Sequence, residues 1–157
     1  MNIFFLDENP KECAKMHCDK HCVKMILETA QLLCTAHWST GSKAPYRATH
    51  KNHPSAIWTR KSLENYLWLV HLGIALCEEY TMRYNKTHKT QKIIAWCAVN
   101  LPPLPNKLFT PPPQCMPRAC MLEDAIQAYR NYYITEKKSI AQWNHSKIPE
   151  WFKGKNK

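Results

Sequence analysis

The residues best suited to chemistry lie in one short stretch, Asp19-Lys20-His21, followed by Lys24 and Glu28. A spacing of four places the Lys24 amine and the Glu28 carboxylate one helical turn apart. A carboxylate beside an amine and an imidazole can stabilise an oxocarbenium-like centre at a nucleoside's sugar, or act there as a general acid or base. A lysine in a desolvated cleft can also attack as a Schiff-base nucleophile. A simple ion pair between Lys24 and Glu28 is the alternative.

These residues belong to a polar stripe along one side of a predicted helix. The stripe comprises His17, His21, Lys24, Glu28, Gln31 and Thr35, with Lys20 beside it. At 100° per residue, one apolar face, expected to be the core face, holds Val23, Ile26, Leu27, Ala30, Leu33 and Cys34. The far side holds Cys18, Cys22, Met25 and Leu32. Because a helix that is apolar on two sides must be covered on both, we expect the stripe to line a cleft, although a solvated face is the commoner arrangement.

A second cluster, Arg47, His50, Asn52 and His53, comes directly before a predicted helix that opens with Pro54. Free backbone N–H groups and the positive end of the helix dipole favour phosphate at such a position, and cationic side chains add to this preference. The net charge of +10 also favours polyanions. The sequence therefore predicts a phosphate-binding site here, with nucleic acid or a nucleotide as partner; a basic surface that only keeps the protein soluble is the alternative.

Composition excludes several classes of protein. Three glycines leave almost nothing for a P-loop or a dinucleotide-binding fingerprint. No apolar run approaches the ~20 residues of a bilayer span, and acidic residues follow the N-terminus too soon for a signal peptide. Eight cysteines without such a signal favour reduced thiols, so we expect a cytoplasmic protein that makes no membrane contact. The Cys/His cluster at residues 13–34 lies on one predicted helix and lacks a second ligand pair, so we expect no zinc and no cofactor.

Long runs with a period of 3.6 predict an all-α fold, a single-domain orthogonal helical bundle spanning residues 1–157. After a short extended start at 3–6, the two long helices are predicted from Pro10 to about His37 and from Pro54 to about Tyr84. Shorter helices are predicted over 90–99 and about 121–143. Residues 102–117 hold seven of the eleven prolines and predict a packed, proline-rich connector. An apolar plug at 149–152 comes before a basic tail at 153–157.

Three of these segments together resemble the pyrimidine-dimer DNA glycosylase family, known in phage as endonuclease V. They are Asp19-Lys20-His21 with Glu28, the helix that follows His53, and a closing Pro-x-Trp-aromatic-Lys at 149–153, and they cover about half of the chain in the right order. The pattern Asn52-His53-Pro54 with Trp58 and Arg60 is similar to that of phage and bacterial members.

The resemblance implies an all-helical DNA-repair enzyme that cleaves the N-glycosidic bond of a damaged or modified pyrimidine and then acts as an imine-forming lyase. It places Glu28 at the family's catalytic glutamate and His21 at the histidine seven residues before it. The family's nucleophile is the α-amine of a small residue exposed when the initiator Met is removed. Here Asn2 is bulky, so we expect Met1 to be retained, and the nucleophile is either the Met1 amine or Lys24.

Two further family positions differ in this chain. The arginine next to the N-terminus is replaced by Ile3, and the arginine three residues after the glutamate is replaced by Gln31. The catalytic residues expected are Glu28, Lys24 and His21. The residues expected to bind phosphate or nucleic acid are His17, Lys20, Gln31, Arg47, His50, Asn52, His53 and Arg60.

Two other functions are compatible with the same residues. The basic cleft could bind or hydrolyse small phosphorylated nucleotides, including cyclic nucleotide signals. The aromatic faces could instead serve a structural interaction module. Salt-sensitive binding of duplex DNA favours the glycosylase, whereas tight binding of a mononucleotide or a cyclic dinucleotide favours the nucleotide binder.

Overall fold

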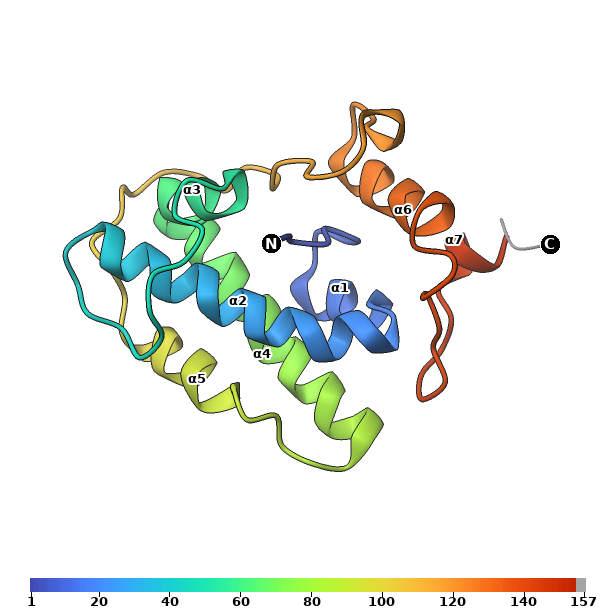
Figure 1. Cartoon of the computed structure of the whole chain (residues 1–157), viewed down its shortest axis with the longest axis horizontal. Helices are drawn as coiled ribbons and strands as arrows, with labels where there is room; N and C mark the ends of the chain where they lie inside the picture. The colour runs from blue at the N-terminus through green and yellow to red at the C-terminus, as the bar shows by residue number, and fades with distance from the viewer. Residues whose placement is uncertain (155–157) are drawn as a thin grey trace.

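The computed structural model describes residues 1–154 and is all-helical over that range, as predicted (Figure 1). Its α-helices are α1 (Pro10–Met16), α2 (Asp19–Ser39), α3 (Pro54–Lys61), α4 (Leu63–Tyr84), α5 (Gln91–Val99), α6 (Ala125–Thr135) and α7 (Glu150–Lys153). A single 3₁₀ turn, η1, spans Arg118–Cys120. None of these helices is long and apolar enough to cross a membrane. Most of the predicted basic tail, residues 155–157, lies outside the described residues.

The two long helices, α2 and α4, cross at the centre of the molecule, with α1 against α4 and α5 against both (Figure 1). Gly73 of α4 lies where α2 and α5 pack against this helix. A Cβ atom at this position would lie 3.1 Å from side-chain atoms of both Thr29 on α2 and Ile94 on α5. The absence of a side chain therefore allows three helices to meet around one core.

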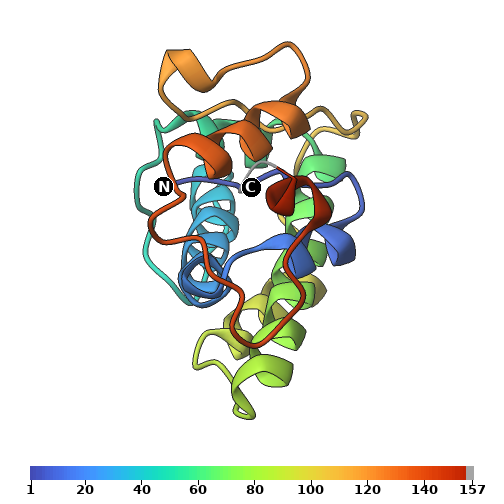
Figure 2. The ribbon, with the colours of Figure 1, turned by 90° about the vertical axis from the view of Figure 1, so that its right-hand side faces the viewer.

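The C-terminal part forms a second wall around the N-terminal segment. Figure 2 shows residues 1–6 running between α6 and the pair formed by α2 and α4. The Phe4 ring stacks on His21 of α2, with 4.1 Å between centroids, and on Tyr132 of α6, with 6.1 Å between centroids. The extended start predicted at 3–6 pairs with no strand within residues 1–154. Buried side chains hold it instead.

The first long helix is predicted without a break, whereas the chain leaves the helical conformation at His17 and Cys18. His17 has ψ 130° and Cys18 has ψ 162°, which separates α1 from α2. Arg83 of α4 explains the break, because its guanidinium donates hydrogen bonds to the carbonyl oxygens of His17 at 2.8 Å and Lys15 at 3.1 Å. Those carbonyl groups would otherwise accept bonds from the next helical turn.

The second long helix is also interrupted, at Ser62, which is extended with φ −152° and ψ 155°. Its side chain accepts a hydrogen bond from the N–H of Asn65 at 3.1 Å and so caps α4. The Asn65 side chain in turn donates to the Trp58 carbonyl at 2.9 Å, which closes the end of α3. The last helix, predicted over 121–143, is limited to α6, which Asp124 caps.

Other predicted elements agree with the structure. The helix predicted over 90–99 is α5, and the segment 102–117 has no helix. Phe109 anchors this proline-rich connector against Trp58 and Trp68, at 6.0 and 5.7 Å between ring centroids. The apolar plug is also packed, since Phe152 is buried with its ring 4.8 Å from that of Trp143.

The predicted core face of α2 is partly wrong. Val23 and Leu27 are 37% and 41% exposed, although the other four residues of that face are buried. The four residues of the far side, Met25 and Leu32 among them, are buried as well. The reason is that α2 is a central helix, covered by α4 and α5 on one side and by the N-terminal segment and α3 on the other, so only a narrow sector meets solvent.

Candidate active site

Glu28 lies in the middle of α2, and its side chain is only 11% exposed. Its Oε1 atom accepts a hydrogen bond from the Asn2 N–H at 3.2 Å and lies 3.4 Å from the α-amine of Met1. Its Oε2 atom lies 3.9 Å from Nζ of Lys24, one helical turn away, whose side chain is 71% exposed. One carboxylate thus faces two amines, the first held inside and the second at the rim.

These groups line a cleft of about 410 Å³. Its walls are formed by Met1, Asn2, Phe4, His21, Lys24, Met25, Glu28, His53, Cys115, Tyr132 and Lys137. A volume of this size falls in the range typical of small-molecule sites. The prediction that the middle of the polar stripe lines a cleft is therefore confirmed for His21, Lys24 and Glu28.

Asn2 fixes the position of the Met1 amine. Its side-chain amide donates to the carbonyl of Cys115 in the connector at 2.8 Å. Its Oδ1 atom lies 2.9 Å from the Tyr129 hydroxyl on α6. Ile3 and Phe4, which follow, are buried. The first residues are therefore held by three separate parts of the fold, and the amine is directed at Glu28.

His21 forms an aromatic wall of the cleft. Its Nδ1 atom lies 2.7 Å from the Tyr133 hydroxyl, and its ring stacks on Phe4. Burial, together with smaller effects of the neighbouring His17, Lys137 and Lys24, lowers the pKa of His21 to about 3. The imidazole is therefore neutral at pH 7, which suits hydrogen bonding and stacking better than donation of a proton as an imidazolium.

His53 is the residue of the second cluster that reaches the cleft. Its Nδ1 atom accepts the N–H of Ser55 at 3.1 Å and caps α3. Partial burial lowers its pKa, and the N-terminal amine and His50 lower it further, while Glu28 acts in the opposite direction. A neutral ring beside the amine and the carboxylate results. Its cap also occupies one of the backbone N–H groups that are expected from the sequence to face phosphate.

The other members of the predicted phosphate site do not line this cleft. Arg47 is exposed and lines a separate hollow of about 340 Å³ together with Gln31 of the stripe. His50 and Asn52 are exposed on the loop before α3. Arg60 supports that loop, since its Nη1 atom donates to the Lys51 carbonyl at 2.7 Å.

His17, Gln31 and Thr35 of the predicted stripe, and Lys20 beside it, do not line this cleft. His17 belongs to the break before α2, is fully buried, and has its Nδ1 atom 2.8 Å from the Cys13 carbonyl oxygen. Burial lowers its pKa to about 4. Lys20 is exposed and is not part of the cleft lining. The Cys/His cluster is thus divided between two helices, and within residues 1–154 no group of three or more His, Cys, Asp or Glu side chains is arranged to hold a metal ion.

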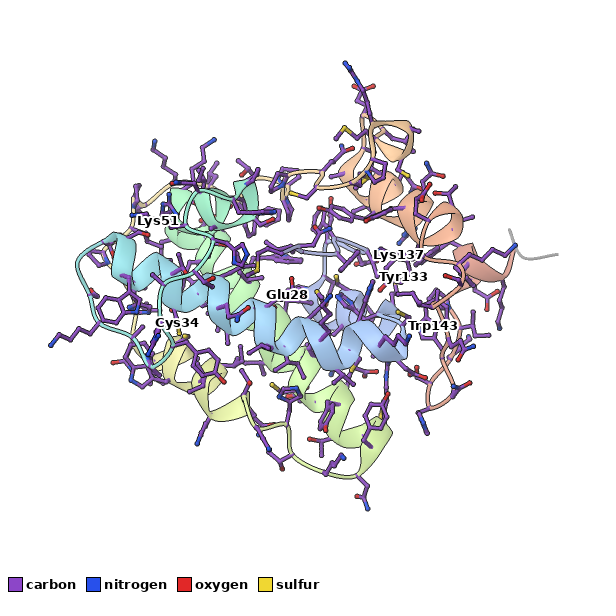
Figure 3. The ribbon with its side chains drawn as sticks, in the orientation of Figure 1. Glu28, Cys34, Lys51, Tyr133, Lys137 and Trp143 are labelled. Carbon is purple, nitrogen blue, oxygen red and sulfur yellow. The ribbon has the colours of Figure 1, made fainter. Side chains whose placement is uncertain are left out.

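Six lining residues are not predicted as site residues from the sequence, and three of them, Cys115, Tyr132 and Lys137, lie far along the chain from the rest (Figure 3 labels Lys137 and Glu28). They come from the connector, from α6 and from the turn after it. No spacing in the sequence relates them to Glu28. The one available signal is that Lys137 lies in a basic pair, Lys137-Lys138, within a segment predicted to be helical.

A family model described as pyrimidine dimer DNA glycosylase matches residues 1–92, which include Met1, Glu28 and His53 and all of α1 to α4. No curated protein and no solved structure matches the chain. Because the family model covers more than half of the sequence, the chain belongs to the pyrimidine dimer DNA glycosylase family.

Proposed function

We propose that this protein cleaves the N-glycosidic bond of a damaged or modified pyrimidine in DNA and then acts as an AP lyase through an imine. The family, which acts on DNA, supports the substrate class. The observation that carries the proposed chemistry is the Met1 amine, 3.4 Å from Oε1 of Glu28 inside the cleft. Such a pair combines a nucleophile with a carboxylate that can accept its proton.

In the proposed first step, the neutral amine attacks C1′ of the target nucleotide. The bond between C1′ and the base breaks, and the base leaves with that electron pair and takes up the proton that the attacking nitrogen loses. Positive charge develops at C1′ as this bond breaks, and the Glu28 carboxylate stabilises it. Glu28 is the only acidic residue among the described residues that line the cleft, so its carboxylate is the one negative charge there that can stabilise the positive charge at C1′.

In the second step, the sugar ring opens, its oxygen takes a proton, and the bond between nitrogen and C1′ becomes a protonated imine. Removal of a proton from C2′ then expels the 3′ phosphate, which cuts the strand. Water later hydrolyses the imine and releases the amine. Every step uses groups of this chain, the DNA and water.

The geometry favours Met1 over Lys24 as the nucleophile. The amine of Lys24 lies farther from the carboxylate, at 3.9 Å, and at the end of an exposed side chain. Holding it at C1′ would restrict several rotatable bonds, each at a cost in entropy. The Met1 amine is already positioned through Asn2, so attack from it requires less ordering. Lys24 is better placed to contact a phosphate at the rim.

Borohydride trapping tests this proposal. The wild-type protein is incubated with a duplex that carries one pyrimidine dimer, or one abasic site, in the presence of borohydride, and the adduct is located by proteolysis and mass spectrometry. We expect strand cleavage and a DNA adduct on the peptide that contains Met1. Lys24→Ala should still form the adduct, and Lys15→Ala, which changes an exposed lysine outside the cleft, serves as its control.

Two results would contradict the proposal. An adduct on the Lys24 peptide, lost in Lys24→Ala, would transfer the nucleophile to the lysine. Neither cleavage nor adduct on both duplexes would refute the glycosylase. Calorimetric titration with a mononucleotide and a cyclic dinucleotide would then test the alternative of a small-nucleotide binder.

A further inference from the structure

Lys137 reaches the cleft from the part of the chain that lies beyond the family match. Residues 1–92 supply Glu28, Lys24 and the Met1 amine, whereas Lys137 follows α6. We infer that Lys137 is a positioning residue that holds a DNA phosphate on the wall of the cleft opposite α2, an inference that rests on DNA being the substrate of the proposed function. Figure 3 shows Lys137 near the end of α6 and Glu28 on α2, and both line the cleft.

The backbone of Lys137 is fixed by the end of α6. Its N–H donates to the Tyr132 carbonyl at 3.1 Å, and its own carbonyl accepts from the N–H groups of Ile140 at 3.0 Å and Ala141 at 2.9 Å. A lysine on such a turn loses less freedom on binding an anion than one on a free loop. The cation is therefore delivered to the cleft from a rigid support.

The side chain is positioned as well. Nζ of Lys137 lies 5.1 Å from the centroid of the Tyr132 ring, within the range of a cation–π contact. The Tyr132 ring stacks on Phe4, which stacks on His21 of α2. Three rings thus connect the ammonium group to the wall that carries Glu28, and the whole row faces the same cleft.

The charge of Lys137 is not balanced by a carboxylate. Within residues 1–154 it forms no ion pair, whereas Arg83 and Arg130 each pair with an acidic side chain. The Met1 amine and Lys24 share the single carboxylate of the described cleft lining, which therefore carries three amines and one acid. Such a surplus repels other cations and attracts an anion. A nucleotide whose sugar meets the Met1 amine would bring phosphates with it.

If Lys137 had only a structural role, its loss would affect DNA binding differently from the loss of a phosphate contact. If the ammonium group served only to cover the Tyr132 ring, its loss would change stability without changing the dependence of DNA binding on salt. A phosphate contact instead releases a counterion, and each such contact contributes about 0.9 to the slope of log affinity against log salt. The salt slope therefore separates the two roles.

The experiment compares Lys137→Met, which keeps the apolar stem but removes the charge, with the wild type. Lys138→Met is the matched control, because Lys138 is the exposed neighbour outside the cleft lining. Affinity for a duplex containing a tetrahydrofuran abasic analogue is measured by fluorescence anisotropy over a range of salt concentrations. The salt slope should fall by about 0.9 for Lys137→Met, and the affinity near physiological salt by about fivefold. Lys137→Arg should restore both.

Cleavage kinetics add a second readout. When a phosphate contact is equally strong in the ground and transition states, its loss raises KM and leaves kcat unchanged. Lys137→Met should therefore raise KM by about fivefold. Equal salt slopes for Lys137→Met and Lys138→Met would overturn the inference while leaving the proposed function intact. If the wild type neither cleaves nor forms an adduct, but Lys137→Met still lowers the slope, the phosphate contact stands and the proposed chemistry fails. Wild-type binding that does not respond to salt would overturn the inference itself.

Discussion

Glu28→Gln tests the proposed chemistry most directly, because it keeps the size and one hydrogen-bond acceptor of the side chain and removes its charge. The Met1 amine lies 3.4 Å from Oε1, and a reacting C1′ atom would lie about 3–3.5 Å from that amine. With the two contacts at a roughly tetrahedral angle on the nitrogen, the carboxylate stands about 5.5 Å from the developing positive charge. At an effective dielectric constant of about 20, this interaction contributes about 3 kcal/mol to the transition state, or a factor of about 10² in rate.

Folding should be much less affected. The Asn2 N–H can still bond to the amide oxygen of the substituted side chain, and Lys24 is largely exposed, so we expect the free energy of unfolding to change by about 1 kcal/mol or less. Urea denaturation measures this change. Single-turnover cleavage of a duplex with one pyrimidine dimer measures the rate. Glu78→Gln, an exposed carboxylate on α4, is the control.

Two outcomes would refute the reasoning about Glu28. A rate within about threefold of the wild type would show that the charge does not act at C1′. Loss of the folded state in Glu28→Gln, with Glu78→Gln unaffected, would show that the carboxylate mainly anchors the N-terminal segment. In that case the cleft would need another group to stabilise the transition state.

Three further predictions concern folding and are measured by urea denaturation. Arg83→Met should lower the free energy of unfolding by about 3–5 kcal/mol, because two buried carboxylates, those of Asp19 and Glu79, lose their cation; no change would mean that the ion pairs are dispensable. Gly73→Ala should cost about 1–3 kcal/mol, since the new Cβ would lie 3.1 Å from side chains of α2 and α5; a variant as stable as the wild type would show that these side chains can move aside. Stability should also decrease as pH falls from about 6.5 towards about 3, because burial depresses the folded-state pKa of His21 to about 3 and the unfolded chain therefore takes up the proton first. His21→Gln should flatten this decrease, and an unchanged pH profile would contradict the expected role of His21.

Helical periodicity predicts which parts of the chain are helical but not where the two long helices are interrupted. No proline or glycine marks the break at His17 and Cys18, and the apolar spacing continues through it. The cause is Arg83, which lies 66 residues later and takes the His17 carbonyl. At Ser62 a local signal exists, because serine is a favoured N-cap. Serine also occurs within helices, so only the bond to Asn65 distinguishes the two cases.

The same limit applies to burial on α2. Periodicity assigns residues to faces, but the number of faces that are covered depends on how many elements surround the helix. Val23 and Leu27 are exposed because no helix covers their sector within the described part of the chain, whereas Met25 and Leu32 are buried on the opposite side. A helix at the centre of a bundle can bury nearly all of its surface, and its sequence then shows little contrast between faces.

Some contacts of the candidate site follow from local spacing in the sequence, whereas others depend on residues far away along the chain. The Lys24 and Glu28 pair follows from a spacing of four on a helix, so it is predictable. The approach of the Met1 amine to the same carboxylate is not, because Asn2 is held by residues 113 and 127 positions away along the chain. Spacing alone therefore leaves the nucleophile open between the two amines. The path of the first six residues between α2 and α6 favours the Met1 amine as the nucleophile. Lys137, which follows α6, enters the cleft from the α6 side.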